Sequence, residues 1–230
     1  MKFDFHEFFN KALNGSSDNK IVFDSFKNDF SFTWNEIKDI AISCAAIAAA
    51  FTIAINIGKP IDFWTVIYFF VLSLFAVGIG FVLHELSHKY VAIKNDFEAV
   101  FVSSYPNIVF MLIVSFFGVV FAAPGAVVIK KKGNVVYSPA RLIEKMGVIS
   151  IAGPLMNIFL AVVFMLLYFA FGSVFFSFGA MINSWLALFN LIPLFNFDGQ
   201  KVLIWNRKYY FIAISASIVL VTISFIFIGF

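Results

Sequence analysis

Apolar residues along this chain fall into long runs that carry almost no charge. One run covers residues 40–57 and a second covers residues 63–83. Residues 146–195 contain no Asp, Glu, Lys, Arg or His, and a last apolar run covers residues 209–230. Because a membrane-spanning helix needs roughly 20 apolar residues, each of these runs predicts at least one span.

The uncharged stretch 146–195 is too long for a single crossing. As one helix it would extend about 75 Å, whereas the hydrocarbon core of a bilayer is about 30 Å thick. We therefore predict two helices in this stretch, with a reversal of the chain near Gly172 and Ser173.

A further apolar stretch, residues 107–129, is interrupted by Gly118 and by Ala123-Pro124-Gly125. If this stretch crosses the membrane, the two sides carry 7 and 9 Lys and Arg residues, but if it dips in and returns they carry 15 and 1. The second distribution is the bias that positive-inside orientation produces. We therefore predict five spans plus one re-entrant or hairpin element. Val127–Ile129 and Val135–Val136, which flank a turn-forming segment, also permit a β-hairpin here.

The same charge bias predicts a cytoplasmic N-terminus and a multi-pass protein of the cell membrane. Residues 1–36 are expected to form a cytoplasmic or interfacial segment, and residues 37–230 the membrane domain. Thr33 and Glu36 have the spacing of a helix-capping box ahead of the first apolar run.

Composition supports this interpretation and excludes several classes of protein. Hydrophobic residues make up 62% of the chain and charged residues 13%, whereas soluble domains have about 45–50% and about 25%. A water-soluble enzyme, a nucleic-acid-binding protein and a disordered chain are therefore excluded, and the lipid bilayer is the expected surrounding. A single cysteine, Cys44, excludes an intrachain disulfide. The predicted fold class is an all-α polytopic membrane protein.

Candidate chemistry lies at the end of the second apolar run, in His84-Glu85-Leu86-Ser87-His88. On a helix, positions i and i+4 share one face, so His84 and His88 can bind a single metal ion. Two imidazoles and one oxygen ligand suit zinc, with a fourth position left for water. Glu85 is placed to accept a proton from a water molecule that zinc activates, as a general base. The pattern predicts one zinc ion per chain.

The third ligand must come from elsewhere in the chain. Glu98 and Glu144 lie in charged loop regions, whereas Asp198 directly follows the uncharged stretch. In the topology with 15 and 1 basic residues, the second and fourth spans end at the same side of the membrane. That topology brings Asp198 to the face that carries the two histidines. Ser87, Lys89 and other polar residues near the motif predict an approach for water.

Three motifs in order resemble the site-2 protease family of intramembrane zinc metalloproteases. They are the HExxH motif at 84–88, the Gly-Pro-x-x-Asn element at 153–157, and Asn190-x-x-Pro193 followed by Asp198-Gly199. Together they span a three-helix catalytic core, about residues 63–200. No PDZ-like insertion is present, so the chain resembles a minimal, archaeal-like form. Gln200 departs from the second Gly that is common in the family after Asp-Gly.

The resemblance implies that His84, His88 and Asp198 are zinc ligands and that Glu85 is the catalytic base. It also implies that the substrate is a transmembrane protein, cleaved within a transmembrane segment near the cytoplasmic side. An unwound substrate needs hydrogen-bond partners, which the amides of Asn157 or Asn190 could supply for the substrate or its oxyanion. Amides in spans can equally join helices to one another.

Two other functions remain compatible with the sequence. A zinc-binding membrane transporter or sensor also needs His and Asp at membrane depth. Glu85 discriminates between the two, because a permeation site has no need of a base beside its ligands. A scaffold with a vestigial site is a third possibility, although every group that hydrolysis requires is present.

Overall fold

A computed structural model describes residues 30–60, 62–132, 137–194 and 197–228 of the chain. Most of the predicted N-terminal segment, residues 1–29, lies outside the described residues. The described part is mostly helical and contains one two-stranded sheet. In chain order the elements are α3 (Trp34–Asn56), α4 (Phe63–Lys94), β1 (Phe97–Ser103), α5 (Tyr105–Ser115), β2 (Gly125–Lys131), α6 (Pro139–Phe171), α7 (Val174–Asn190), α8 (Asp198–Trp205), α9 (Arg207–Ile223) and a π-helical turn (Ser224–Ile228).

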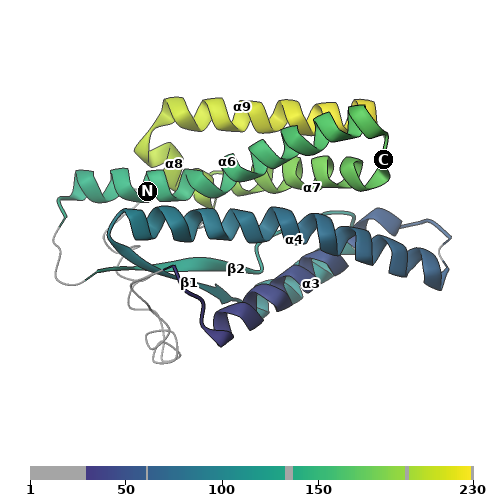
Figure 1. Cartoon of the computed structure of the whole chain (residues 1–230), viewed down its shortest axis with the longest axis horizontal. Helices are drawn as coiled ribbons and strands as arrows, with labels where there is room; N and C mark the ends of the chain where they lie inside the picture. The colour runs from purple at the N-terminus through teal and green to yellow at the C-terminus, as the bar shows by residue number, and fades with distance from the viewer. Residues whose placement is uncertain (1–29, 61, 133–136, 195–196, 229–230) are drawn as a thin grey trace.

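Helix α4 runs through the middle of the molecule and separates two groups of elements. Figure 1 shows α6, α7 and α9 on one side of α4, and the sheet with α3 on the other. α6 packs on both α4 and α7, while α3 packs on α4 and on β1. The predicted three-helix core therefore corresponds to α4, α6 and α7.

Four helices in the described residues are long and apolar enough to cross a membrane: Trp34–Asn56, Phe63–Lys94, Pro139–Phe171 and Arg207–Ile226. The remaining predicted span corresponds to α7, which has 17 residues. Its length of about 26 Å falls short of a bilayer core of about 30 Å. The structure thus has the helices of a multi-pass membrane protein, and the predicted number of five spans depends on α7.

The predicted reversal between the two helices of the uncharged stretch 146–195 is confirmed. α6 ends at Phe171, and Gly172 follows with a left-handed φ of 64°. A glycine adopts this conformation without the steric cost that a Cβ would add, so it is the usual residue at this position. α7 then begins at Val174 and packs back on α6.

The apolar stretch 107–129 forms the short helix α5 and the strand β2 instead of a spanning helix. β2 pairs with β1 in antiparallel register, with Ser103 opposite Gly125 and Phe97 opposite Lys131. Residues 104–124 therefore leave one end of the sheet and return to the same end, as a re-entrant element would. Val127–Ile129 lies in β2, which pairs with β1. The pairing of this segment with Val135–Val136, which the sequence permits, stays a prediction. Residues 133–136 lie outside the described part.

The ends of α4 and α6 that flank the sheet lie together. Lys145, near the start of α6, donates a hydrogen bond from Nζ to the carbonyl oxygen of Asn95, which directly follows α4 (2.7 Å). The end of α4 and the beginning of α6 are therefore at the same end of the bundle. This agrees with the topology in which residues 107–129 do not cross the membrane.

Two carboxylates of α3 hold the outer edge of β1. Asp39 accepts hydrogen bonds from the backbone N–H (3.2 Å) and the hydroxyl group (2.9 Å) of Ser103. Glu36 accepts a hydrogen bond from the backbone N–H of Phe101 (3.0 Å). The expected cap by Thr33 is present, since its hydroxyl oxygen accepts from Glu36 N. The Glu36 carboxylate, however, accepts from Phe101 on β1, whereas in a capping box it would accept from the N-terminus of its own helix.

Glu36 also forms a buried ion pair with Lys89, the residue after His88. Both carboxylate oxygens lie 2.7 Å from Lys89 Nζ, which donates a third hydrogen bond to the carbonyl oxygen of Ser31. Glu36 is 2% exposed and Lys89 is 3% exposed. The prediction that Lys89 lines an approach for water to the motif is therefore wrong. The Lys89 side chain is buried and its ammonium group is bonded to Glu36 of α3.

Glu36→Gln is expected to destabilise the protein by about 3–5 kcal/mol, because it leaves the buried Lys89 charge without its partner. Thermal unfolding of the purified protein in detergent measures this effect. Adding Lys89→Met to Glu36→Gln should recover part of the loss. Lys59→Met, at an exposed position, should change stability by less than about 0.5 kcal/mol. If the loss of stability in the double variant equalled the sum of the losses in Glu36→Gln alone and Lys89→Met alone, the two residues would not be coupled.

Candidate metal centre

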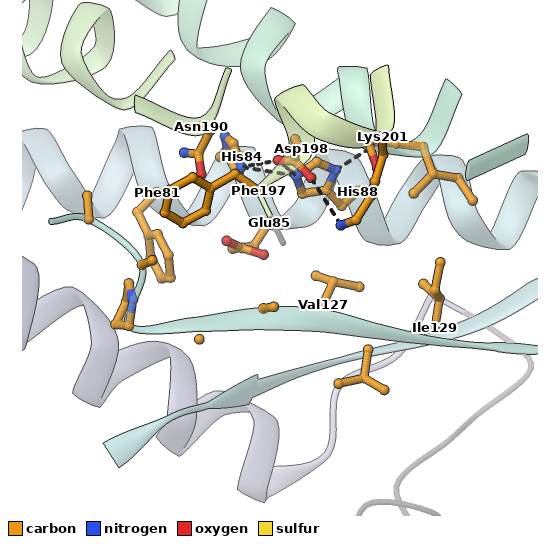
Figure 2. Close-up of a pocket in the computed structure, with 18 of the residues that line it drawn as sticks. Phe81, His84, Glu85, His88, Val127, Ile129, Asn190, Phe197, Asp198 and Lys201 are labelled. Carbon is orange, nitrogen blue, oxygen red and sulfur yellow. Dashed lines mark hydrogen bonds and ion pairs between the residues drawn. The ribbon is translucent and has the colours of Figure 1, made fainter. Parts of the chain in front are cut away.

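The side chains of His84, His88 and Asp198 converge on one point between α4 and α8. The Nε2 atoms of the two histidines are 3.0 Å apart. Asp198 Oδ2 lies 3.5 Å from His84 Nε2 and 3.0 Å from His88 Nε2. Figure 2 shows the three side chains meeting in this way. The structure thus brings together the three residues that the sequence predicts as ligands.

Hydrogen bonds at the far side of each ring orient the two imidazoles. His84 Nδ1 is bonded to Asn157 Oδ1, and His88 Nδ1 to the carbonyl oxygen of Ile149 (2.8 Å). Since both partners are acceptors, each Nδ1 carries the proton and donates it, which leaves the Nε2 lone pairs directed at the common point. Metal-binding histidines commonly have this second hydrogen bond.

The donor set fits a single zinc ion. Ligand atoms at about 2.0–2.1 Å from zinc in a tetrahedral site are about 3.4 Å from one another. The three separations between His84, His88 and Asp198 are 3.0–3.5 Å. Two imidazoles and one carboxylate leave one tetrahedral position free, as in catalytic zinc sites. The fit rests on the chemistry and the separations of these side chains.

Gly153 of α6 gives the two imidazoles their space. A Cβ atom at this position would lie 2.6 Å from His84 Nε2 and closer still to His88 Nε2. Any other residue would therefore push the rings aside. This explains the glycine of the Gly-Pro-x-x-Asn element in structural terms.

Asn157 lies behind His84 and does not face the cavity. Its side chain is fully buried, and its Nδ2 donates to the carbonyl oxygen of Gly80 (3.1 Å) and to Asn183 Oδ1 (3.0 Å). Asn183 donates in turn to the carbonyl oxygen of Gly179. Because these bonds occupy its amide, the placement favours orientation of His84 over the substrate contact expected from the sequence.

Asn183 belongs to this network, although no sequence motif covers it. A Cβ at Gly80 would lie 2.6 Å from Asn183 Oδ1, so this glycine lets α4 and α7 approach closely. The available signal in the sequence was an amide at an apolar position of the uncharged stretch, with Gly80 one turn before His84.

A cavity of about 380 Å³ opens beside the three ligands. Glu85, which is 8% exposed, lines it together with His84 and His88. Figure 2 shows the Glu85 carboxylate pointing into the space between the ligands and strand β2. Glu85 and the three candidate ligands therefore share one cavity, and the role of Glu85 as a general base stays a prediction.

The re-entrant element forms the cavity wall that lies opposite the histidines and Glu85. Residues 122–129, which include most of β2, line it. Asn190, at the end of α7, lines it too, with its Nδ2 bonded to the carbonyl oxygen of Leu186 (2.9 Å). A contact between Asn190 and substrate therefore stays a prediction that this placement allows.

Asp198 is the first residue of α8, whose first turn lies against the backbone of Leu191, the residue that follows α7. A Cβ at Gly199 would overlap the backbone of Leu191, so only a glycine lets the two segments meet here. Burial by itself would raise the pKa of Asp198, but His88 and His84 in their protonated form, together with Lys201, hold it well below its usual range. The carboxylate is thus in the charged form that binds a cation.

Neither alternative acidic ligand lies at the site. Glu98 is on β1, opposite Lys130 in the register of the sheet, and Glu144 is exposed on α6. Lys201, by contrast, lines the cavity and was not singled out by the sequence. Its position three residues after Asp198 was the only signal for it.

Comparison with known proteins identifies one relative. It is a protein of Methanocaldococcus jannaschii with the name "Putative zinc metalloprotease MJ0611". The two sequences are 40% identical over 183 residues, which cover 77% of this chain and 87% of the relative. No protein-family model and no solved structure matches the chain.

Asp198→Ala is expected to weaken zinc binding more than about 100-fold, because even loss of an outer-sphere partner typically costs 10–100-fold. Metal analysis of the purified protein and competition with a chelator measure this. Glu98→Gln and Glu144→Gln, at the alternative carboxylates, should bind zinc like the wild type. Wild-type affinity in Asp198→Ala would show that the third ligand is another residue.

Gly153→Ala is expected to lower zinc affinity by about 10–100-fold, because the added methyl group displaces both imidazoles. The matched control is Gly78→Ala, since a Cβ at Gly78 has no atom within 4 Å. Equal zinc affinity in the two variants would contradict the role given to Gly153.

Proposed function

This chain belongs to the same zinc metalloprotease family as its archaeal relative, and on that premise we propose that it is an intramembrane protease of the site-2 protease type. It hydrolyses a peptide bond within or near a transmembrane segment of another protein. One observation carries the proposal: Glu85 and the His-His-Asp group face one cavity within a bundle of membrane-length helices.

Glu85 acts as the general base. When bound, the zinc ion would polarise the scissile carbonyl and make a water molecule more acidic. Glu85 takes a proton from the attacking water and passes it to the leaving amide nitrogen. A transporter or sensor would have no use for this carboxylate, which is why hydrolysis is favoured.

The substrate enters in an extended conformation. A transmembrane helix hides its carbonyl groups in its own hydrogen bonds, so the segment must unwind before it can be attacked. The N–H groups of Phe101 and Ser103 point from β1 toward α3. By the alternation of an antiparallel pair, the backbone groups of Val127 and Ile129 then point away from β1, at the cavity wall. This edge supports pairing with an unwound substrate strand.

The site lies toward one surface of the membrane. His84 is about 30 Å along α4 from its first residue, Phe63, so it is close to the far end of a span. The bias of Lys and Arg residues makes this surface the cytoplasmic one. Substrate cleavage therefore takes place near the cytoplasmic side of the cell membrane.

Glu85→Gln is expected to retain zinc and to lower proteolysis by about 10²–10⁴-fold, because general-base catalysis contributes that much. The test uses purified protein in liposomes with a single-span reporter whose transmembrane helix contains destabilising Gly and Pro residues. Mass spectrometry should find cleavage within that segment by the wild type only. In the same liposomes Val127→Pro, which removes an N–H group from the outer edge of β2, should reduce cleavage.

A zinc indicator inside the liposomes examines the transporter alternative. Transport of zinc by the wild type, without any cleavage of the reporter, would refute the proposed protease function. Equal cleavage by wild type and Glu85→Gln would refute the role of Glu85.

A further inference from the structure

Lys201 enters the cavity beside the ligand group. It lies one helical turn after Asp198 on α8, and its Nζ is 3.7 Å from Asp198 Oδ1. The other oxygen of that carboxylate, Oδ2, faces His84 and His88. Figure 2 shows Lys201 reaching past Asp198 into the cavity, where Glu85 also points. The lysine is therefore on the reaction side of the site.

The contact between Lys201 and Asp198 is loose. A separation of 3.7 Å is longer than a hydrogen bond, and the Lys201 side chain is 32% exposed. An ion pair with this geometry restricts a flexible side chain very little. Its ammonium group can therefore turn toward a molecule in the cavity without breaking a strong bond.

Amide hydrolysis requires a group of this kind. As water attacks, negative charge develops on the carbonyl oxygen, and donors fixed near that oxygen stabilise the transition state. Besides the histidines, the side-chain donors among the described residues that line the cavity belong to Ser150, Asn190 and Lys201. The Asn190 amide already donates to the carbonyl oxygen of Leu186. Lys201 is the only Lys or Arg among these donors, so it supplies the strongest interaction with an anion.

We propose that Lys201 is a further catalytic residue, whose Nζ donates a hydrogen bond to the carbonyl oxygen of the scissile bond as that oxygen becomes negatively charged. This inference rests on the proposed protease function. In the same proposal Lys201 binds the carboxylate of the newly formed product. The negative charge of that carboxylate lies at nearly the same place as the charge of the transition state.

The reaction balances with the residues in the cavity. The water oxygen forms a bond to the carbonyl carbon, and the π electron pair moves to the carbonyl oxygen beside Lys201. Glu85 holds the proton of the water and transfers it to the amide nitrogen. The C–N bond then breaks, the carbonyl re-forms, and the products are an amine and a carboxylic acid. The acid releases its proton to water, Glu85 is again a carboxylate, and Lys201 keeps its proton throughout.

A different role would make Lys201 a positioning residue that acts only by stabilising the charge of Asp198. The two roles differ in what they predict for the metal. If Lys201 acted through Asp198, its removal would change metal affinity or the coordination of the metal. If Lys201 contacts the reacting oxygen, the metal site is unchanged and the affinity for a bound anion falls.

The variants that separate these roles are Lys201→Met, Lys201→Arg and the control Lys208→Met, at an exposed position of α9. Each purified protein is loaded with Co²⁺, whose visible spectrum reports its ligands and geometry. The probe is N-acetyl-leucine, a small mimic of the carboxylate product, and its binding is followed by the change in that spectrum. This measurement needs no substrate, so it remains informative if the protease function fails.

We expect the spectrum and stoichiometry of the metal to be the same in all the variants before the probe is added. Lys201→Met should bind N-acetyl-leucine about 10-fold more weakly than wild type, whereas Lys201→Arg should stay within about 3-fold. With the single-span reporter, Lys201→Met should lower kcat by about 10²–10³-fold with little change in KM. Lys208→Met should match the wild type in every measurement.

Two results would overturn the proposal. Loss of metal or an altered spectrum in Lys201→Met would show that Lys201 acts through Asp198. Wild-type affinity of Lys201→Met for N-acetyl-leucine would show that it does not contact the reacting oxygen. Absence of cleavage by the wild type would instead refute the proposed function, while the binding of the probe still decides whether Lys201 contacts an anion.

Discussion

The close approach of α6 to α4 at Gly153 is the constraint on which the metal site depends. Two imidazoles one turn apart can share an ion only if the neighbouring helix leaves room for both. Gly153 leaves that room, and Asn157, one turn later, reaches His84 Nδ1. The same stretch of α6 thus provides the space for the rings and the hydrogen bond that orients one of them.

The polar groups around the site are paired within the protein because a bilayer offers no water to replace a lost partner. Asn157 and Asn183 join α4, α6 and α7 through their amides. On the other side of α4, Lys89 and Glu36 connect the HExxH helix to α3 and to strand β1. The sheet is therefore held in place at the edge away from the cavity. Its other edge forms the wall that faces Glu85.

Much of this could be predicted from the order of apolar and charged residues. The apolar runs predicted the membrane helices, and the absence of charge over residues 146–195 required a reversal, which occurs at Gly172. Local spacing predicted that His84 and His88 share a face. Lys and Arg counts predicted that residues 107–129 return to the side they left, and the pairing of β1 with β2 agrees. These features depend on solvation and helix geometry, which neighbouring residues in the sequence determine.

The sequence by itself determined the apolar helices and the chemistry of the HExxH motif. The tertiary structure alone decided which distant residues complete them. The pairing of Glu36 with Lys89, the place of Asn183 behind His84 and the entry of Lys201 into the cavity join residues from different helices. Apolar periodicity does not encode such contacts, because many packings of the same helices would bury the same faces. Close approach at individual glycines, and the pairing of these buried polar groups across helices, selected one of them.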